Sequence, residues 1–331
     1  MKYRRMGRTG LMVSEICLGT MTFGNQIDEA EAAKLIKWAL DAGINFVDTA
    51  DQYVNGLTEE IVGKALKGVR HDVVLATKVG GWKSGPTVND IGTSRRHIMD
   101  GVEGSLRRLG TDYIDIFYTH RWDHATPIDE TLRALDDMVH QGKVRYIACS
   151  NYLVWQLCKA LWVSDALNLT RYDCAQPPYS LITRDIEDEM LEFCVNEGIG
   201  VCVYNPLAGG LLTGKHDPNK PPPEDSRFGN KMMGKMYSGR YWLDSDFKAV
   251  AGIKKITEKH GRSMPQFALA WILNNKAITS VICGANSVKQ LEENVGAVDL
   301  ILSEEELSAC DEVWHQLRPP RFTYGSQQLY R

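Results

Sequence analysis

The sequence predicts an α/β protein that folds as a closed (β/α)8 TIM barrel. Eight short β-like segments alternate along the chain with amphipathic segments of helical period, and most connections are short turns. Several β-like segments, such as VVLAT at 73–77 and VCVY at 201–204, are apolar without strict alternation, as is typical of parallel strands covered on both faces. Because no linker divides the chain, we expect residues 1–331 to form one domain.

The expected strands are short and bounded by turn residues. They cover residues 16–18, 46–48, 73–77, 114–118, 144–149, 173–175, 201–204 and 280–282. With a helix after each strand, they favour a closed barrel over an open sheet.

The expected helices carry start and stop signals. Asp28 and Glu31 form a capping-box pattern before an apolar face, and Gly43 ends that helix. Further helices are expected from Ser94 to Gly110, from Thr126 to Gly142, and over 185–197, 247–259 and 263–275, with capping pairs at Ser263 and Gln266, Ser287 and Gln290, and Ser303 and Glu306.

Three segments depart from the alternation. Residues 1–13 precede the first barrel strand and contain the turn-rich RTG, so we expect a hairpin across the bottom of the barrel. Residues 206–245, rich in Pro, Gly and charge, are too long for a plain connection after the seventh strand, which leaves a lid or binding loop and a disordered insertion as alternatives. The tail 318–331 could reach over the top of the barrel.

Composition points to small-molecule partners. The chain has 38 basic and 42 acidic residues, a formal charge of -4, and no basic run with interleaved aromatics, so neither nucleic acid nor an anionic membrane surface is an expected partner. No apolar stretch approaches the ~18 residues of a membrane span, and the start lacks the apolar region of a signal peptide. We therefore expect a cytoplasmic protein.

Cysteine and histidine patterns give no support to a disulfide framework or a metal site. The eight Cys residues include no CxxC pair, and several lie in apolar strand-like runs, which indicates reduced core residues. No HExxH motif or His-rich cluster occurs in the sequence.

Polar residues follow the expected strands at the edge where such barrels form their active sites. The second strand ends at Asp48 with Tyr53 beyond it, the third ends at Lys78, and the fourth ends at His120. Each has an ordinary structural interpretation: an acidic turn with a packed Tyr, a solvated Lys, and a hydrogen-bonded His. Together they form a coherent acid and base set at one mouth.

The chemistry that fits this set is carbonyl reduction. A phenol has a pKa of about 10, and a neighbouring Lys78 ammonium should lower the pKa of Tyr53 so that it can protonate an alkoxide. Asp48 would keep Lys78 charged, while His120 would hold the substrate oxygen and help relay the proton. No residue is an obvious hydride source, so a nicotinamide cofactor must supply the hydride.

Ordered motifs along nearly the whole chain carry a family resemblance. They are FVDTADQY, LATKVG, YTHRWD, CSNY, QPPYS, YNPLAGGLLTGK and GANSVKQLEEN. The chain resembles the aldo-keto reductase superfamily, in the branch that includes microbial carbonyl reductases and potassium-channel beta subunits. The resemblance implies a catalytic tetrad of Asp48, Tyr53, Lys78 and His120, with Tyr53 as general acid.

The same resemblance implies a cofactor site for NADPH/NADP across the strand ends. Ser150, Asn151 and Gln176 would hold the nicotinamide carboxamide, and Tyr204 would stack on the ring. The long loop with Lys215 would clamp the adenosine half. The full implied set is Gly19, Thr20, Met21, Asp48, Ser150, Asn151, Gln176, Tyr204, Asn205, Pro206, Leu207, Gly209, Leu212, Lys215, Arg227, Gly284, Asn286, Gln290, Glu293 and Asn294.

Several alternatives stay open. Gln290 can serve the helix cap as well as the adenine, and the glycines after Tyr204 can be plain turn formers. Many relatives have Arg or Lys where this chain has Asn286, which keeps NAD as an alternative cofactor, although Lys215 and Arg227 still favour NADPH. The absence of a GxGxxG after the first strand argues against a Rossmann site.

The substrate is expected to be a small-molecule aldehyde or ketone, with a sugar-like carbonyl as one version. The residues expected around it are Tyr53, Trp82, His120, Arg121 and Trp122, with Asp51 and Asp123 near the mouth. The alternative function is a cofactor-binding regulatory or sensor subunit with little turnover, as channel beta subunits suggest. Assembly into homo-oligomers stays open.

Overall fold

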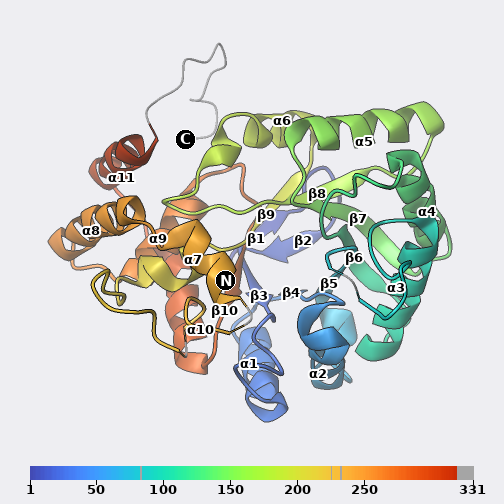
Figure 1. The fold of residues 1–331 in the computed structure, drawn as a ribbon, viewed down its shortest axis with the longest axis horizontal. Coiled ribbons are helices and arrows are strands. Elements are labelled where there is room, and N and C mark those ends of the chain that lie inside the picture. Colours follow the sequence, from blue (N-terminus) through green and yellow to red (C-terminus); the bar gives the residue numbers. More distant parts are fainter. Residues whose placement is uncertain (83, 225, 232, 319–331) are drawn as a thin grey trace.

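Parallel strands close into a barrel with helices around it in the computed structural model of the chain (Figure 1), which describes residues 1–82, 84–224, 226–231 and 233–318. Around the ring the strand order is β10-β3-β4-β5-β6-β7-β8-β9. The strands are β3 (Ile16–Gly19), β4 (Phe46–Asp48), β5 (Val74–Val79), β6 (Ile114–Thr119), β7 (Val144–Ser150), β8 (Tyr172–Gln176), β9 (Gly200–Val203) and β10 (Ser280–Gly284). The predicted (β/α)8 TIM barrel is confirmed, with most strands one or two residues longer than expected.

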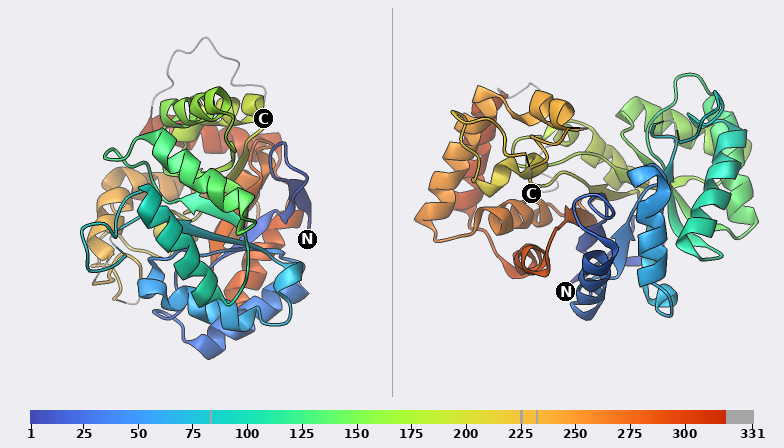
Figure 2. Two further views of the ribbon diagram at one scale, coloured as in Figure 1. Left: turned by 90° about the vertical axis from the view of Figure 1, so that its right-hand side faces the viewer. Right: turned by 60° about the horizontal axis from the view of Figure 1, so that its bottom comes forward.

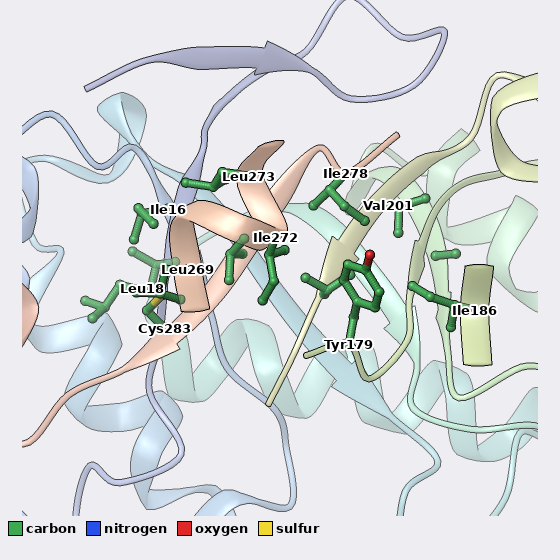
Figure 3. Close-up of a cluster of buried hydrophobic side chains, with 14 of the residues drawn as sticks. Ile16, Leu18, Tyr179, Ile186, Val201, Leu269, Ile272, Leu273, Ile278 and Cys283 are labelled. Carbon is green, nitrogen blue, oxygen red and sulfur yellow. The ribbon is translucent and has the colours of Figure 1, made fainter. Parts of the chain in front are cut away.

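Two hydrophobic clusters divide the strand side chains between the barrel interior and the surrounding helices. In β3, Ile16 and Leu18 belong to the large outer cluster, whereas Cys17 belongs to the smaller interior one. Figure 3 shows Ile16 and Leu18 beside Leu269 and Ile272 of helix α9. Because successive side chains of a strand point to opposite faces, this alternation fixes which residues reach the interior.

The helices cover the outside of the barrel, as the two views of Figure 2 also show. They are α1 (Glu29–Asp41), α2 (Leu57–Ala65), α3 (Arg95–Leu109), α4 (Ile128–His140), α5 (Val154–Leu167), α6 (Met190–Glu197), α7 (Gly234–Tyr241), α8 (Asp244–Lys259), α9 (Met264–Asn274), α10 (Val288–Val295) and α11 (Glu304–Leu317). No helix in the described parts of the chain is long and apolar enough to cross a bilayer.

Several predicted N-cap residues are confirmed, one of them in a complete capping box. Asp28 and Ser287 each accept a hydrogen bond from the backbone N–H three residues on, and Ser303 with Glu306 forms a complete capping box. Ser263 is the N-cap residue of α9 as predicted, but the predicted capping box with Gln266 is wrong, because the Ser263 hydroxyl instead donates to Glu293 Oε1 at 2.5 Å.

Some helix boundaries also differ from the prediction. Helix α4 begins at Ile128 rather than at Thr126, whose hydroxyl donates to Asp123 Oδ2 at 2.7 Å. The run expected at 185–197 is divided into the 3₁₀ turn η3 (Asp185–Glu187) and α6, and α8 begins three residues earlier than expected, at Asp244.

The predicted N-terminal hairpin is present. Strands β1 (Tyr3–Arg5) and β2 (Met12–Ser14) pair antiparallel, and the Met6 side chain between them enters the interior cluster. A Cβ at Gly7 would lie 2.3 Å from Gly198 O, so only glycine allows this turn to approach the amino end of β9 so closely. The hairpin thus closes the bottom of the barrel, opposite the carboxyl ends of the strands.

The long segment after β9 has secondary structure of its own. It forms the 3₁₀ turn η4 (Ala208–Thr213) and helix α7, in which Tyr237 and Tyr241 are buried. These elements favour the lid or binding loop over the disordered insertion for the described part of the segment. Of the predicted tail over the barrel, residues 319–331 lie outside the described residues.

Candidate active site

Side chains alternate between the two faces of a β-strand, and this alternation turns the predicted polar residues toward the barrel interior at the carboxyl ends of the strands. In β4, Phe46 faces the barrel interior, so Asp48 does too; in β5, Val74 and Ala76 face inward, so Lys78 follows. His120 continues the inward set of β6 after Ile116 and Tyr118, and Gln176 continues that of β8 after Cys174. Tyr204 and Ser150 follow inward residues of β9 and β7 in the same way.

A buried ion pair lies at the base of this site. Lys78 is fully buried, and its Nζ donates to Asp48 Oδ2 at 2.5 Å and to the Thr49 carbonyl at 2.7 Å. The other Asp48 oxygen, Oδ1, accepts from Gln176 Nε2 at 2.9 Å. Hydrogen bonds on both oxygens and on the ammonium offset the desolvation of the two charges.

Tyr53 lies above this ion pair at the start of the 3₁₀ turn η1 (Tyr53–Gly56). The Lys78 ammonium lies 5.2 Å from the centre of the Tyr53 ring, and the His120 ring meets the Tyr53 ring edge-on at 6.1 Å. The two residues after Tyr53 are left-handed, Val54 at φ 47° and Asn55 at φ 54°. This conformation is costly for a β-branched residue, so the turn that carries the phenol is strained.

Burial and the neighbouring charges set the protonation states. Burial raises the pKa of Tyr53, with Lys78 opposing, so the predicted lowering of that pKa is not reached and the phenol keeps its proton. Burial lowers the pKa of Lys78, but Asp48 and Tyr53 raise it, and the net direction is upward. Burial, Lys78 and Arg121 hold the pKa of His120 well below its usual range, which makes the imidazole neutral.

This arrangement can bind and protonate an oxygen. A neutral His120 offers one N–H donor, and a protonated Tyr53 offers an acidic O–H beside an ammonium. The buried Nδ1 of His120 has no hydrogen-bond partner among the described residues.

A cavity of about 1580 Å³ opens above these residues. It exceeds the ~300–1,000 Å³ of a typical small-molecule pocket, which leaves room for an extended dinucleotide together with a second molecule. Tyr53, Trp82, His120 and Arg121 line it, as do all of the predicted cofactor residues except Leu212. The residues therefore fit a nicotinamide dinucleotide that lies across the strand ends.

Near the tetrad, the predicted nicotinamide residues hold one another in place. Asn151 Nδ2 donates to the His120 carbonyl at 2.8 Å, and Asn151 Oδ1 accepts from the Tyr204 hydroxyl at 2.6 Å. Ser150 Oγ donates to the Gln176 carbonyl at 2.9 Å. Asn151 adopts a left-handed backbone at φ 58°, which Asn tolerates better than most residues.

At the far end of the cavity, the predicted clamp residues are engaged with one another. Arg227 Nη1 donates to Asn205 Oδ1 at 3.4 Å and to the Tyr237 hydroxyl at 3.3 Å. Gln290 Oε1 accepts from the Asn286 backbone N–H at 2.8 Å. The Gln290 side chain thus holds the residue before the N-cap and does not complete the predicted capping box with Ser287; it also lines the cavity.

Four predicted site residues do not line the cavity: Lys78, which is buried beneath it, Asp123, Leu212 and Trp122. Leu212 is fully buried in the outer hydrophobic cluster, because the η4 turn directs its side chain into the core. Trp122 packs edge-on against Tyr152 at 5.2 Å and beside Trp155 at 5.6 Å. The placements of Leu212 and Trp122 depend on loop geometry that the residue types do not reveal.

The cavity also has lining residues that were not predicted from the sequence, among them His97, Asp100 and Arg108 of α3. The available signal was their spacing, since positions three, four, eight and eleven apart share one face of a helix. No group of three or more His, Cys, Asp or Glu able to hold a metal occurs among the described residues, and all eight cysteines are free thiols.

Known proteins resemble this chain over nearly all of its length. The model of the Aldo/keto reductase family matches residues 15–315. A probable voltage-gated potassium channel subunit beta of Arabidopsis thaliana is 39% identical over 306 residues, covering 91% of this chain and 92% of the relative. A protein of the same description from Oryza sativa subsp. japonica is 40% identical over 306 residues, with the same coverage. A putative voltage-gated potassium channel subunit beta of Schizosaccharomyces pombe is 37% identical over 324 residues, covering 94% and 92%.

The predicted resemblance is therefore confirmed by matches that span the barrel and every residue of the tetrad. The chain belongs to the aldo/keto reductase family, a family of oxidoreductases whose members generally bind nicotinamide cofactors, mostly NADPH.

Proposed function

We propose that this protein is an NADPH-dependent reductase that converts an aldehyde or ketone to an alcohol. The observation that carries the proposal is the contact of Lys78 with Asp48 beneath Tyr53 and His120, at the base of a cavity large enough for cofactor and substrate. Bound NADPH would supply the hydride to the carbonyl carbon.

The protein residues perform the acid–base part of the reaction. His120 donates its N–H to the carbonyl oxygen and orients it, because its low pKa leaves the ring neutral. Tyr53 gives its proton to the same oxygen as negative charge develops there, and Lys78 stabilises the phenolate that remains. Asp48 and Gln176 keep Lys78 charged and in position.

The residues proposed to hold the cofactor follow the cavity from the tetrad to α10. The nicotinamide carboxamide would bind to Ser150, Asn151 and Gln176, and the nicotinamide ring would stack on Tyr204. Lys215 and Arg227 both line the cavity and offer the positive charge that a 2′-phosphate needs, which supports NADPH as the first choice and NAD as the alternative.

The test is the turnover of Tyr53→Phe. We expect reduction of a panel of aldehydes and ketones to fall by at least about 100-fold, because the general acid is lost, while NADPH still binds with nearly the wild-type Kd. NADPH absorbance gives the rates, repeated with NADH, and fluorescence titration gives the binding. The matched control is Tyr113→Phe, since Tyr113 precedes β6 at the opposite end of the barrel. Reduction by Tyr53→Phe at the wild-type rate would refute the assignment.

The second candidate is a cofactor-binding regulatory or sensor subunit with little turnover. It is favoured by the relatives, which are named as potassium channel beta subunits. Capture of a channel partner by the full chain, combined with absent turnover on the carbonyl panel, would establish this role over the enzymatic one.

We further propose that residues 1–331 act as one domain in the cytoplasm, which the reduced, mostly buried cysteines favour. A homo-oligomer would suit the family, and light scattering of the purified chain measures the assembly state.

A further inference from the structure

The loop between β5 and helix α3 brings an exposed tryptophan into the wall of the cavity. Trp82 lines the cavity together with Tyr53 and His120, although it is 52% exposed. A side chain that stays half in solvent in the folded protein has few packing contacts to hold it in one place. The position of the indole therefore depends on how the backbone of Trp82 is held.

The loop is closed upon itself and is only weakly bound to α3. A Cβ at Gly80 would lie 2.8 Å from Gly92 O, so the two ends of the loop pass close to each other. Within the loop, the Ser84 backbone N–H donates to the Asp90 carbonyl at 2.8 Å. The Ser84 hydroxyl lies 3.5 Å from His97 Nε2 of α3, which is too far for a strong hydrogen bond. These contacts shape the loop but do not fix its place relative to the tetrad.

Gln52 joins this loop to the turn that carries Tyr53. The Gln52 Oε1 accepts a hydrogen bond from the Trp82 backbone N–H at 2.6 Å. Since an N–H can only donate, the oxygen of the Gln52 amide, and not its nitrogen, faces the loop. The residue before Gln52 is held to β5, because the Asp51 backbone N–H donates to the Lys78 carbonyl at 3.2 Å. The residue after Gln52 is Tyr53, so Trp82 is bound directly to the segment that carries the phenol.

The contact between Gln52 and the loop requires a glycine at position 81. A Cβ at Gly81 would lie 2.0 Å from Gln52 Oε1 and 2.7 Å from Gln52 Cδ. The backbone of Gly81 is not left-handed, so the glycine is needed for space and not for its conformation. An alanine at position 81 would therefore displace the Gln52 amide without straining the backbone.

We propose that Gln52 is a positioning residue for carbonyl reduction, which acts by fixing Trp82 in the wall of the cavity. This inference rests on the proposed reductase function. The fixed indole offers a surface on which a ring or another apolar group of the carbonyl compound packs. Because the acceptor belongs to the residue next to Tyr53, this wall and the proton donor keep one relative position.

Two substitutions should release the loop in different ways. Gln52→Met keeps the length of the side chain but lacks the amide oxygen, and Gly81→Ala pushes the amide away from Trp82. Gln52→Glu retains an acceptor oxygen at the same position and should restore the behaviour of the wild type. Gly10→Ala is the matched control, because a Cβ at Gly10, between β1 and β2, has no atom of the described residues within 4 Å.

The kinetic test follows NADPH oxidation with benzaldehyde, which has a ring, and with propanal, which has none. We expect the KM for benzaldehyde to rise about fivefold in Gln52→Met and in Gly81→Ala, while kcat and the Kd of NADPH stay within about twofold of the wild-type values. The KM for propanal should change less. In the Trp82→Ala background, Gln52→Met should have no further effect, because Gln52 acts through Trp82.

A readout that needs no turnover is the fluorine NMR signal of Trp82 in protein labelled with fluorotryptophan. The chain has eight Trp residues, and the signal that is absent from Trp82→Phe belongs to Trp82. This signal should be shifted or broadened in Gln52→Met and in Gly81→Ala. It should keep its wild-type position and width in Gln52→Glu and in Gly10→Ala.

An unchanged Trp82 signal in Gln52→Met or in Gly81→Ala overturns the inference. An unchanged KM for benzaldehyde in these variants, or an equal rise in the Trp82→Ala background, also overturns it. Wild type that reduces neither aldehyde contradicts the proposed function instead. In that case the Trp82 signal of the NADPH-bound protein is titrated with benzaldehyde. A shift that requires more benzaldehyde in Gln52→Met supports the positioning role, and a shift that is absent or unaffected overturns it.

Discussion

The carboxyl group of Asp51 should make the stability of the protein depend on pH in a way that one substitution removes. Burial is the main cause that raises the pKa of Asp51 from 3.8 to about 7, with Glu59 adding to the effect and Arg108 opposing it. The unfolded chain therefore releases this proton near pH 4, whereas the folded chain holds it up to about pH 7. Stability from Asp51 is fully present below the lower pKa and is lost as the pH rises through the higher one.

The size of the effect follows from the two pKa values. A shift of about 3 units at 1.36 kcal/mol each gives a penalty of about 4 kcal/mol once Asp51 is fully ionised in the folded protein. At about pH 5.5 the penalty is about 2 kcal/mol, so it should grow by a further ~2 kcal/mol by about pH 8. Asn has nearly the same shape as Asp and does not titrate, so the stability of Asp51→Asn should lack this dependence on pH.

The assay is urea unfolding of wild type and Asp51→Asn in the same buffers at the two pH values. The free energy of unfolding of the variant relative to wild type should rise by about 2 kcal/mol from the lower to the higher pH. Asp72→Asn, which changes an exposed carboxyl, should show no such rise. A constant difference between Asp51→Asn and wild type at both pH values would show that Asp51 is not held protonated by its surroundings.

Two more predictions concern the tetrad and its support. Asp48→Asn removes the carboxylate that raises the pKa of Lys78, so the alkaline limb of the kcat against pH profile should move to lower pH, and turnover should fall; a profile that keeps the wild-type limb would contradict the relay. Val54→Gly relieves the left-handed strain after Tyr53 and should raise the free energy of unfolding by about 1 kcal/mol in urea titrations. A loss of stability in Val54→Gly would mean that the turn is not strained.

The tetrad could be predicted because its placement depends on local rules. Asp48, Lys78 and His120 each stand at the carboxyl end of an apolar strand, and the period of two then turns all three to the barrel interior. Closure of the barrel then brings the carboxyl ends of the strands, and with them these side chains, close together, independently of the loop sequences.

Contacts between distant residues could not be predicted in this way. The hydrogen bond from Gln176 to Asp48 joins positions 128 apart across the barrel mouth, and no sequence pattern distinguishes it from a contact with cofactor. The Arg108 side chain of α3 likewise packs closely against Gly56, which precedes α2, and the sequence gives no sign of this tertiary contact. Ser263 occupies the N-cap of α9 but forms no capping box with Gln266, because its hydroxyl donates to the distant Glu293 carboxylate instead.

The complete burial of Lys78 has a further consequence for its chemical reactivity. Acylating reagents and acyltransferases need a neutral, accessible amine. The Lys78 amine is buried, and it is held in its charged form by the hydrogen bond to the Asp48 carboxylate. In the folded protein, Lys78 should therefore remain unmodified while exposed lysines such as Lys67 are acylated. The fraction of Lys78 that becomes labelled, measured by peptide mass spectrometry, would therefore report how often the carboxyl end of the barrel opens transiently.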